Sequence, residues 1–340
     1  MDAKVGVMLL NLGGPDKLED VYPFLYNLFS DPDLIRIPLP WLQKPLAAFI
    51  AAKRTPISQQ NYAAIGGGSP LRQITQEQAD ALENTLQRLG LNAKVYVAMR
   101  YWQPDTATAL HQLKQDQITK LVVLPLYPQF SISTTGSSLK HLNHLWQRDP
   151  VLQKIEKIAI RSWCDRPGYI RAMADLIAQK LKVSAPETYI FFSAHGVPKK
   201  YVTDYGDTYQ LEIENCVDGI MQCLRREFGC NHSHLLAYQS RVGPVEWLQP
   251  YTEEAIAKLA QRGINHLLVV PISFVSEHIE TLQEIDMEYR EVAESVGIEH
   301  FDRVPALNSD PAFIKDLADL VLESLSQQLA TPMEAVNLAP

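Results

Sequence analysis

The sequence predicts an α/β protein built from two similar, doubly wound domains, each with a parallel sheet covered by helices. Three observations lead to this prediction. Apolar runs of Val, Ile and Leu alternate with helical stretches, one helix–strand segment occurs twice, and 340 residues are enough for two cores of ordinary size.

Six apolar runs are predicted to be strands, because little polar alternation is typical of strands that are buried on both faces. In chain order they are Val5–Leu10, Lys94–Met99, Leu121–Leu126, Ile190–Ser193, Leu235–Gln239 and Leu267–Ile272. The stretches between them are predicted to contain helices, among them Gln76–Leu89, Pro167–Leu181, Tyr209–Phe228 and Thr252–Arg262. Strands and helices thus alternate as in Rossmann-like domains.

An internal repeat supports two similar halves. A shift of 146 residues places Gln103–Pro125 over Gln249–Pro271 without a gap, and ten of the 23 positions are identical. The first strands of the halves align at an offset of 183, which places Leu12 opposite His195. The two offsets differ by 37 residues, so the first half carries an insertion, for which the proline-rich, apolar stretch Ser30–Pro70 is the candidate.

The repeat also suggests where the domains end. We expect a first domain over residues 1–165, with its insertion at about 30–70, and a second over 166–310. Residues 311–330 are predicted to form a C-terminal helix that packs back on the first domain, and 331–340 a tail.

Composition excludes some classes of protein. A net charge of −8 argues against a nucleic-acid partner, and no apolar run reaches the ~18 residues of a membrane span. The first residues pass directly into a predicted strand, which leaves no room for a secretory signal. The four cysteines form no C-x-x-C pair, as expected of reduced thiols. Together these features predict a cytoplasmic protein.

His195 is the first candidate functional residue. It follows the predicted strand Ile190–Ser193, and ligands of open α/β sheets bind beyond the carboxyl ends of the strands. A histidine satisfied by a backbone carbonyl in the core is the alternative interpretation.

The equivalent strand end of the repeat is followed by a ladder of glutamates, Glu280, Glu284, Glu288 and Glu291, with His278 just before it. We expect Ser276 to cap the helix that carries them. An α-helix would spread carboxylates spaced by four around its surface, whereas a π-type turn would align them. A solvated acidic face is the ordinary alternative. A histidine facing carboxylates suits a divalent cation and the removal of protons.

Seven motifs, in order and across nearly the whole chain, resemble the ferrochelatase family, most closely its cyanobacterial and plastid branch. They are LLNLGGP, RTPISQQNYAAIGGGSPLR, MRYWQP, LYPQFSISTTGSS, FFSAHGVP, QSRVGPVEWLQPYTEEAI and FVSEHIETLQEIDMEY. The resemblance implies two chelatase-type domains that face each other across a porphyrin cleft. It implies insertion of Fe²⁺ into protoporphyrin IX, with release of two protons, as the last step of protoheme synthesis. Fe²⁺ is then a substrate, and no permanently bound cofactor is implied.

The resemblance also assigns residues. His195 and Glu280 match the active-site histidine and its acidic partner, as proton acceptor, metal ligand or both, while Glu284, Glu288 and His278 continue as a path for protons or metal. The positions that match porphyrin-binding residues are Leu12, Lys53, Arg54, Tyr62, Ser69, Arg100, Tyr101, Tyr127 and Trp247.

Two departures from the family pattern bear on the iron–sulfur cluster and on the C-terminal transmembrane helix of some relatives. Animal members hold an iron–sulfur cluster through an internal cysteine and three near the C-terminus, but here the internal position is Ile132 and no cysteine follows Cys230. We therefore expect no iron–sulfur cluster. Some relatives continue into a transmembrane helix, which we expect to be absent or removed from a chain that ends in MEAVNLAP.

The apolar segment Leu34–Ala52, called the lip below, is predicted to touch a membrane peripherally without spanning it. A helix that seals the core is the alternative for the lip. Three other functions stay open at this point: a cobalt or nickel chelatase on the same plan, a nucleotide-dependent transferase, and a tetrapyrrole or metal carrier without catalysis.

Overall fold

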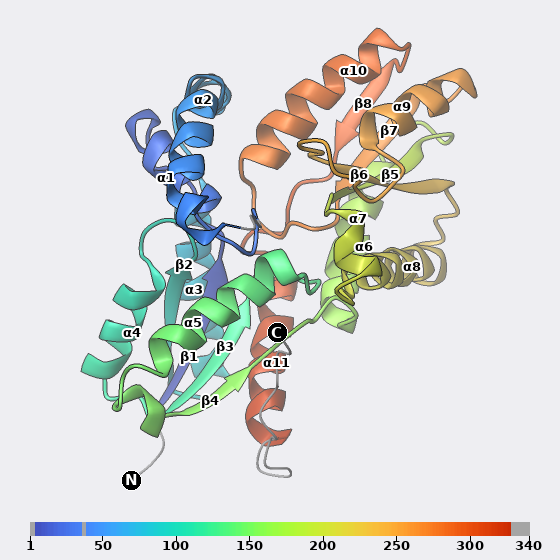
Figure 1. Cartoon of the computed structure of the whole chain (residues 1–340). Coiled ribbons are helices and arrows are strands. Elements are labelled where there is room, and N and C mark those ends of the chain that lie inside the picture. The colour runs from blue at the N-terminus through green and yellow to red at the C-terminus, as the bar shows by residue number, and fades with distance from the viewer. Residues whose placement is uncertain (1–3, 36–38, 328–340) are drawn as a thin grey trace.

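The structure is a computed structural model that describes residues 4–35 and 39–327. It contains two four-stranded parallel sheets (Figure 1). The first sheet consists of β1 (Val5–Asn11), β2 (Ala93–Met99), β3 (Lys120–Pro125) and β4 (Glu156–Ala159), in the order β2-β1-β3-β4. The second consists of β5 (Tyr189–His195), β6 (His234–Gln239), β7 (His266–Pro271) and β8 (His300–Arg303), in the order β6-β5-β7-β8. The identical strand order confirms two similar α/β halves.

The strand register supports the alignment on which the repeat depends. Leu10 pairs with Pro125 in the first sheet, and Ser193 pairs with Pro271 in the second. Since Pro125 and Pro271 are equivalent in the repeat, Leu10 is equivalent to Ser193. Leu12 and His195 each lie two residues further on and are therefore structural counterparts.

Helices cover both faces of each sheet, as the apolar strands require. On the first sheet, Met8 and Leu10 of β1 face a core cluster that contains α4 (Thr106–Gln115) and α5 (Ser137–Trp146). The second sheet has an equivalent cluster with α9 (Thr252–Gln261) and α10 (Arg290–Ser295). A short helix, α7 (Lys199–Thr203), follows β5.

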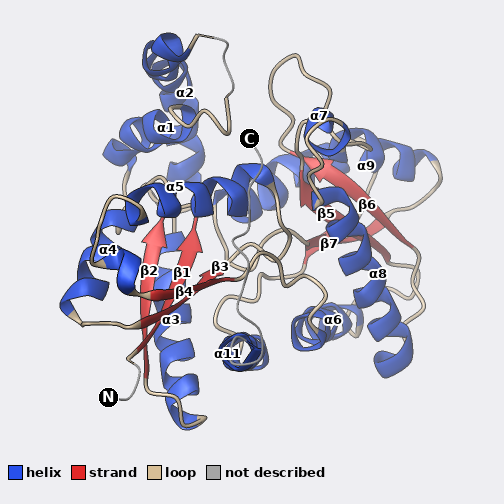
Figure 2. Ribbon diagram, turned by 60° about the horizontal axis from the view of Figure 1, so that its bottom comes forward, coloured by secondary structure: helices blue, strands red, loops and turns tan. Residues whose placement is uncertain are grey.

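A large core cluster joins the inner faces of the two sheets. It contains residues from α3 (Leu71–Arg88), α6 (Pro167–Leu181), α8 (Tyr209–Phe228) and α11 (Pro311–Gln327). In both views α11 lies between the two halves (Figures 1 and 2), where it packs on α3 and α6. The predicted tail 331–340 lies outside the described residues.

Asp316 anchors α11 to α6. Arg166 donates two hydrogen bonds to the Asp316 carboxylate, at 3.0 and 3.1 Å, and the backbone N–H of Tyr169 donates a third. A Cβ on Gly168 would come within 2.5 Å of the Asp316 side chain, so this close approach requires glycine.

The first half also carries two helices, α1 (Val21–Phe29) and α2 (Gln43–Ala64), that rise together above the first sheet (Figures 1 and 2). They pack on each other around a small cluster that includes Val21, Phe24 and Ala51. Part of the lip forms the first half of α2, while Ile37 within the lip lies outside the described residues.

No helix among the described residues is long and apolar enough to cross a membrane.

Candidate active site

His195 is the last residue of β5, a strand otherwise buried along its whole length. Two hydrogen bonds fix its backbone. Its N–H donates to Ser273 Oγ at 2.9 Å, and its carbonyl accepts from Tyr209 Oη at 2.8 Å. The side chain keeps 36% of its accessible surface, so the imidazole is held firmly and can still be reached by a ligand.

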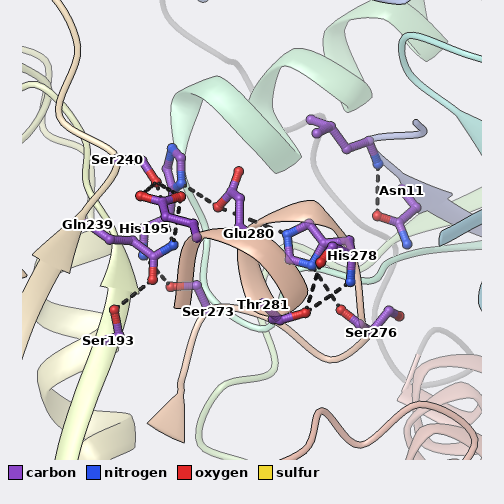
Figure 3. Close-up of polar contacts among 12 residues, drawn as sticks. Asn11, Ser193, His195, Gln239, Ser240, Ser273, Ser276, His278, Glu280 and Thr281 are labelled. Atoms are coloured by element: carbon purple, nitrogen blue, oxygen red, sulfur yellow. Dashed lines mark hydrogen bonds and ion pairs between the residues drawn. The ribbon is translucent and has the colours of Figure 1, made fainter. Parts of the chain in front are cut away.

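The imidazole of His195 contacts the carboxylate of Glu280, with Nδ1 and Oε2 2.8 Å apart (Figure 3). Desolvation lowers the pKa of His195, but the Glu280 carboxylate outweighs it, so the net shift is upward. Desolvation raises the pKa of Glu280, but His195 and His278 hold it below its usual value. The pair therefore combines a proton acceptor of raised basicity with a carboxylate that stays ionised.

Glu280 begins a π-helix, η5 (Glu280–Tyr289), the type of turn that would align the glutamates. One turn further on, Glu284 accepts hydrogen bonds from Ser240 Oγ at 2.7 Å, Tyr289 Oη at 2.7 Å and Gln239 Nε2 at 3.3 Å. Desolvation, and then the charge of Glu280, raise the pKa of Glu284. The two carboxyls thus differ in protonation tendency, which is the condition for passing a proton from one site to the next.

Glu288 lies exposed at the outer end of this row and accepts a hydrogen bond from Gln283 Nε2 at 2.8 Å. Gln283 in turn accepts one from Asn61 Nδ2 of α2, at 3.1 Å. The helices of the first half therefore contact the glutamate helix of the second half directly.

His278 is buried, and burial lowers its pKa. Its Nδ1 lies 3.1 Å from the carbonyl oxygen of Ser276, and its Nε2 lies 4.0 Å from Glu280 Oε2. The ring of Phe274 packs between His278 and His195. The prediction that Ser276 caps the glutamate helix is wrong. The helix η5 begins four residues after Ser276, and the Ser276 hydroxyl donates instead to Gln78 Oε1 of α3.

Leu12 lies on the first-half side of the site. It packs against the cluster formed by residues of α1 and α2 with Tyr62 and Tyr101, and Ile279, just before η5, packs against the same cluster. Burial, and then the Glu280 carboxylate, raise the pKa of Tyr62, so the phenol faces the acidic helix. The structure thus brings Leu12 and Tyr62 next to the start of η5.

Arg100 and Tyr101 are held by Asp31, a buried residue that our sequence reasoning missed. Asp31 Oδ2 accepts hydrogen bonds from Arg100 Nη2 at 2.8 Å, Tyr101 Oη at 2.6 Å and Ser137 Oγ at 2.6 Å. Burial would raise the pKa of Asp31, but these donors hold it below its usual value. No local sequence pattern points to Asp31, because its partners lie 69 to 106 residues away in the chain.

The remaining predicted residues are more scattered. Lys53 and Arg54 lie exposed on α2, and Ser69 Oγ accepts a hydrogen bond from the backbone of Leu71 at the start of α3. Trp247 packs on Gly196, one residue after His195, at 3.2 Å from the position of an added Cβ. Tyr127 follows β3, and burial raises the pKa of its phenol.

Comparisons with known proteins agree with this geometry. A model of the ferrochelatase family matches residues 4–325. Curated ferrochelatases from Cyanothece sp. and Trichodesmium erythraeum are 61% and 62% identical over 99% of this chain and 88% and 86% of their own lengths. The one from Synechocystis sp. is 60% identical over 96% of this chain and 84% of its own length.

Solved structures share the fold at low identity. SirB from Bacillus subtilis with Fe³⁺ superposes with a TM-score of 0.54 at 11% identity, over 96% of this chain and 98% of SirB. DR2241 from Deinococcus radiodurans, described as similar to chelatases, gives 0.52 at 13% identity, over 95% of this chain and 55% of its own.

Two parallel sheets of identical strand order, together with the likeness to solved chelatases, give this chain the two-domain α/β fold of chelatases. The family comparison is more specific, because it spans almost all the described residues at high identity. This chain belongs to the ferrochelatase family, the porphyrin-metallating enzymes of heme synthesis, and acts on a porphyrin and ferrous iron.

Proposed function

We propose that this chain inserts Fe²⁺ into protoporphyrin IX at the site formed by His195 and Glu280. The proposal depends on the distance of 2.8 Å between His195 Nδ1 and Glu280 Oε2. This contact joins the end of β5 to the start of the π-helix η5. Metallation needs a group that removes the two pyrrole N–H protons and a group that attracts the cation. The imidazole supplies the first and the carboxylate the second.

Proton removal follows from the charges. His195, with its raised pKa, accepts a pyrrole proton, and the resulting imidazolium is stabilised by ionised Glu280. Glu284, whose pKa is raised, takes the proton next, and exposed Glu288 releases it to water. Two such transfers balance the two charges of the incoming Fe²⁺.

The porphyrin is proposed to lie between this side and the first half. Leu12, Tyr62 and Trp247 would pack on the macrocycle. Lys53, Arg54 and Ser69 would hold its propionates, since a guanidinium forms paired hydrogen bonds with carboxylate. Arg100, Tyr101 and Tyr127 would line the same side as Leu12.

We further propose that the enzyme works without a resident cofactor or iron–sulfur cluster. The four cysteine thiols are free, and burial raises the pKa of three of them, Cys164, Cys216 and Cys223. Cluster ligands are thiolates, so raised pKa values disfavour that role.

The lip is proposed to bring the enzyme to the cytoplasmic surface of a membrane. Trp41, in the turn just before α2, and Phe49 of α2 keep 71% and 67% of their surface, and exposed Lys44 and Lys53 lie on α2. An exposed apolar patch flanked by lysines is typical of peripheral contact with anionic lipid. Trp41→Ser with Phe49→Ser should reduce co-sedimentation with anionic vesicles, whereas Val183→Ser, at an exposed position outside the lip, should not.

An anaerobic assay with Fe²⁺ and protoporphyrin IX, followed by loss of porphyrin fluorescence, tests the reaction. We expect His195→Ala and Glu280→Gln to lose turnover and still bind porphyrin. His111→Ala, at an exposed histidine of α4, is the control and should keep full activity. Normal turnover in either site variant would contradict the proposed site.

A further inference from the structure

A second group of metal-ligating side chains lies at the opposite end of the second sheet. His266 begins β7 and His300 begins β8, and the two residues pair directly in the parallel register. Their imidazole rings lie 4.3 Å apart between centroids, with 20° between the ring planes. Glu299 precedes His300, and ligating atoms of all three residues lie within 4.8 Å of one another.

The backbone holds this group in place. The N–H groups of Glu299 and His300 both donate to the carbonyl oxygen of Asn265, at 2.9 Å each. This pair of hydrogen bonds fixes the first residues of β7 and β8 side by side. The carboxylate of Glu187, just before β5, lies 3.6 Å from His266 Nε2 and adds negative charge. Two imidazoles and two carboxylates therefore come together at the starts of three neighbouring strands.

We propose that His266, His300 and Glu299 bind a divalent cation of the zinc type. Two imidazoles with one carboxylate form a known zinc ligand set that leaves a fourth position for water. The ligating atoms lie within 4.8 Å of one another, and the stacked imidazole rings must rotate so that a nitrogen of each points at the ion from about 2.0–2.2 Å. Imidazole suits Zn²⁺, Ni²⁺ and Cu²⁺ better than Mg²⁺ or Ca²⁺. His266 is partly covered, while Glu299 and His300 are exposed, so an ion can enter from solvent.

This site is separate from the reaction site. His195 lies at the carboxyl end of β5, whereas the new site lies at the amino ends of β7 and β8. A strand of six or seven residues spans roughly 20 Å. An ion held there links neighbouring strands of the second sheet, so it should stabilise that half without touching the porphyrin.

The test is a Zn²⁺ titration of the untagged, metal-free enzyme against a coloured competing chelator. His195→Ala serves as the background so that the reaction-site histidine does not contribute. In that background, His266→Gln with His300→Gln should lower the number of bound Zn²⁺ ions by one. Glu187→Gln should lower the affinity for the same ion by about tenfold, as expected when a carboxylate beside a metal ligand is lost. The matched control is His111→Gln with His144→Gln, which removes two exposed histidines elsewhere.

A second measurement keeps the proposal falsifiable if glutamine disturbs the strands. In the His195→Ala background, saturating Zn²⁺ should raise the melting temperature of the parent and of the control, but not of the His266/His300 variant. Without metal, that variant should melt as its parent does, and with His195 intact it should keep normal Fe²⁺ insertion. An unchanged Zn²⁺ count in the His266/His300 variant, or an equal loss in the control, would overturn the proposal.

Discussion

The ends of β1 and β5 occupy equivalent places in the two halves but carry different chemistry. Leu12 follows β1, and its counterpart His195 ends β5. The difference continues along the repeat. Thr134 and Ser138 of the first half, in and just after the short π-helix η3 (Ile132–Gly136), correspond by the 146-residue offset to Glu280 and Glu284.

The residues that follow β2 and β6, the second strands of the two halves, also occupy equivalent places and carry different side chains. Met99 of β2 and Tyr238 of β6 make equivalent backbone contacts with Pro104 and Pro250, so Arg100 and Tyr101 correspond to Gln239 and Ser240. The first pair contacts the buried carboxylate of Asp31, and the second contacts Glu284. One scaffold therefore orders a carboxylate at both places, and in the second half the neighbouring Glu280 also contacts the imidazole of His195.

We propose that the shared scaffold positions the functional groups in both halves and that the different side chains divide the work between them. An apolar Leu12 can neither accept a proton nor bind Fe²⁺, so its contribution is packing. The helices α1 and α2, which lie next to Leu12, give that half additional apolar surface.

The largest expected effect comes from exchanging the two strand-end residues. His195→Leu should lower kcat by about 10²- to 10⁴-fold, the range of a lost general base. Adding Leu12→His should not restore turnover, because the first half has threonine and serine where the second has Glu280 and Glu284. Steady-state rates of the single and double variants give the answer. Recovery in the double variant would show that the halves are interchangeable.

A smaller effect is expected from Leu12→Ala. Removing the packed part of the side chain should weaken porphyrin binding by about 1–3 kcal/mol. The proton acceptor is untouched, so kcat at saturating porphyrin should stay close to wild type. Fluorescence titration with protoporphyrin measures the affinity, and Leu39→Ala, at an exposed leucine, serves as a control. A loss of kcat with unchanged affinity would contradict a packing role.

The contact between His195 and Glu280 predicts a pH dependence. His195 must be neutral to accept a proton, so kcat/KM should rise with pH through the pKa of His195, which lies above its usual value of about 6.5. Glu280→Gln removes the charge that raises this pKa. The acidic limb of the remaining activity should therefore move to lower pH. A limb that stays in place would show that another group controls it.

Asp31 predicts a change mainly in substrate binding. Asp31→Asn removes the charge that holds Arg100 and Tyr101, while an amide oxygen can still accept one of their hydrogen bonds. We expect KM for porphyrin to rise several-fold and kcat to change less. Asp33→Asn, which loses only a contact with Lys140, should leave both close to wild type. A fall in kcat alone would place Asp31 in the chemistry instead.

Much of this architecture could be predicted because burial on both faces leaves a clear mark in a sequence. The central strands β1, β3, β5 and β7 and the longer edge strands β2 and β6 contain apolar runs and were predicted, whereas the edge strands β4 and β8 were not. β4 and β8 have only four residues each, and exposed Glu156 and His300 leave them without an apolar pattern.

The site was only partly predictable, for a related reason. The spacing of Glu280, Glu284 and Glu288 is a local pattern that raises a π-type turn as one possibility, beside an acidic face exposed to solvent, and the structure has the π-helix. Asp31 and its partners are 69 to 106 residues apart, and such contacts leave no local pattern. The cap expected at Ser276 failed because its hydroxyl serves a contact between the halves, with Gln78.

The smallest expected effect comes from Ser138, the first-half counterpart of Glu284. It is buried at the start of α5, and Ser138→Ala removes one hydroxyl without adding volume. The hydroxyl of Ser138 makes no hydrogen bond with any residue that the structure describes. If the first half only packs and positions, Ser138→Ala should change kcat less than about twofold and should not lower the free energy of unfolding, because no hydrogen bond is lost. Glu284→Gln, at the equivalent place, should slow proton release and lower kcat far more. Comparable losses in the two variants would show that protons also leave through the first half, and the division of labour between the halves would be wrong.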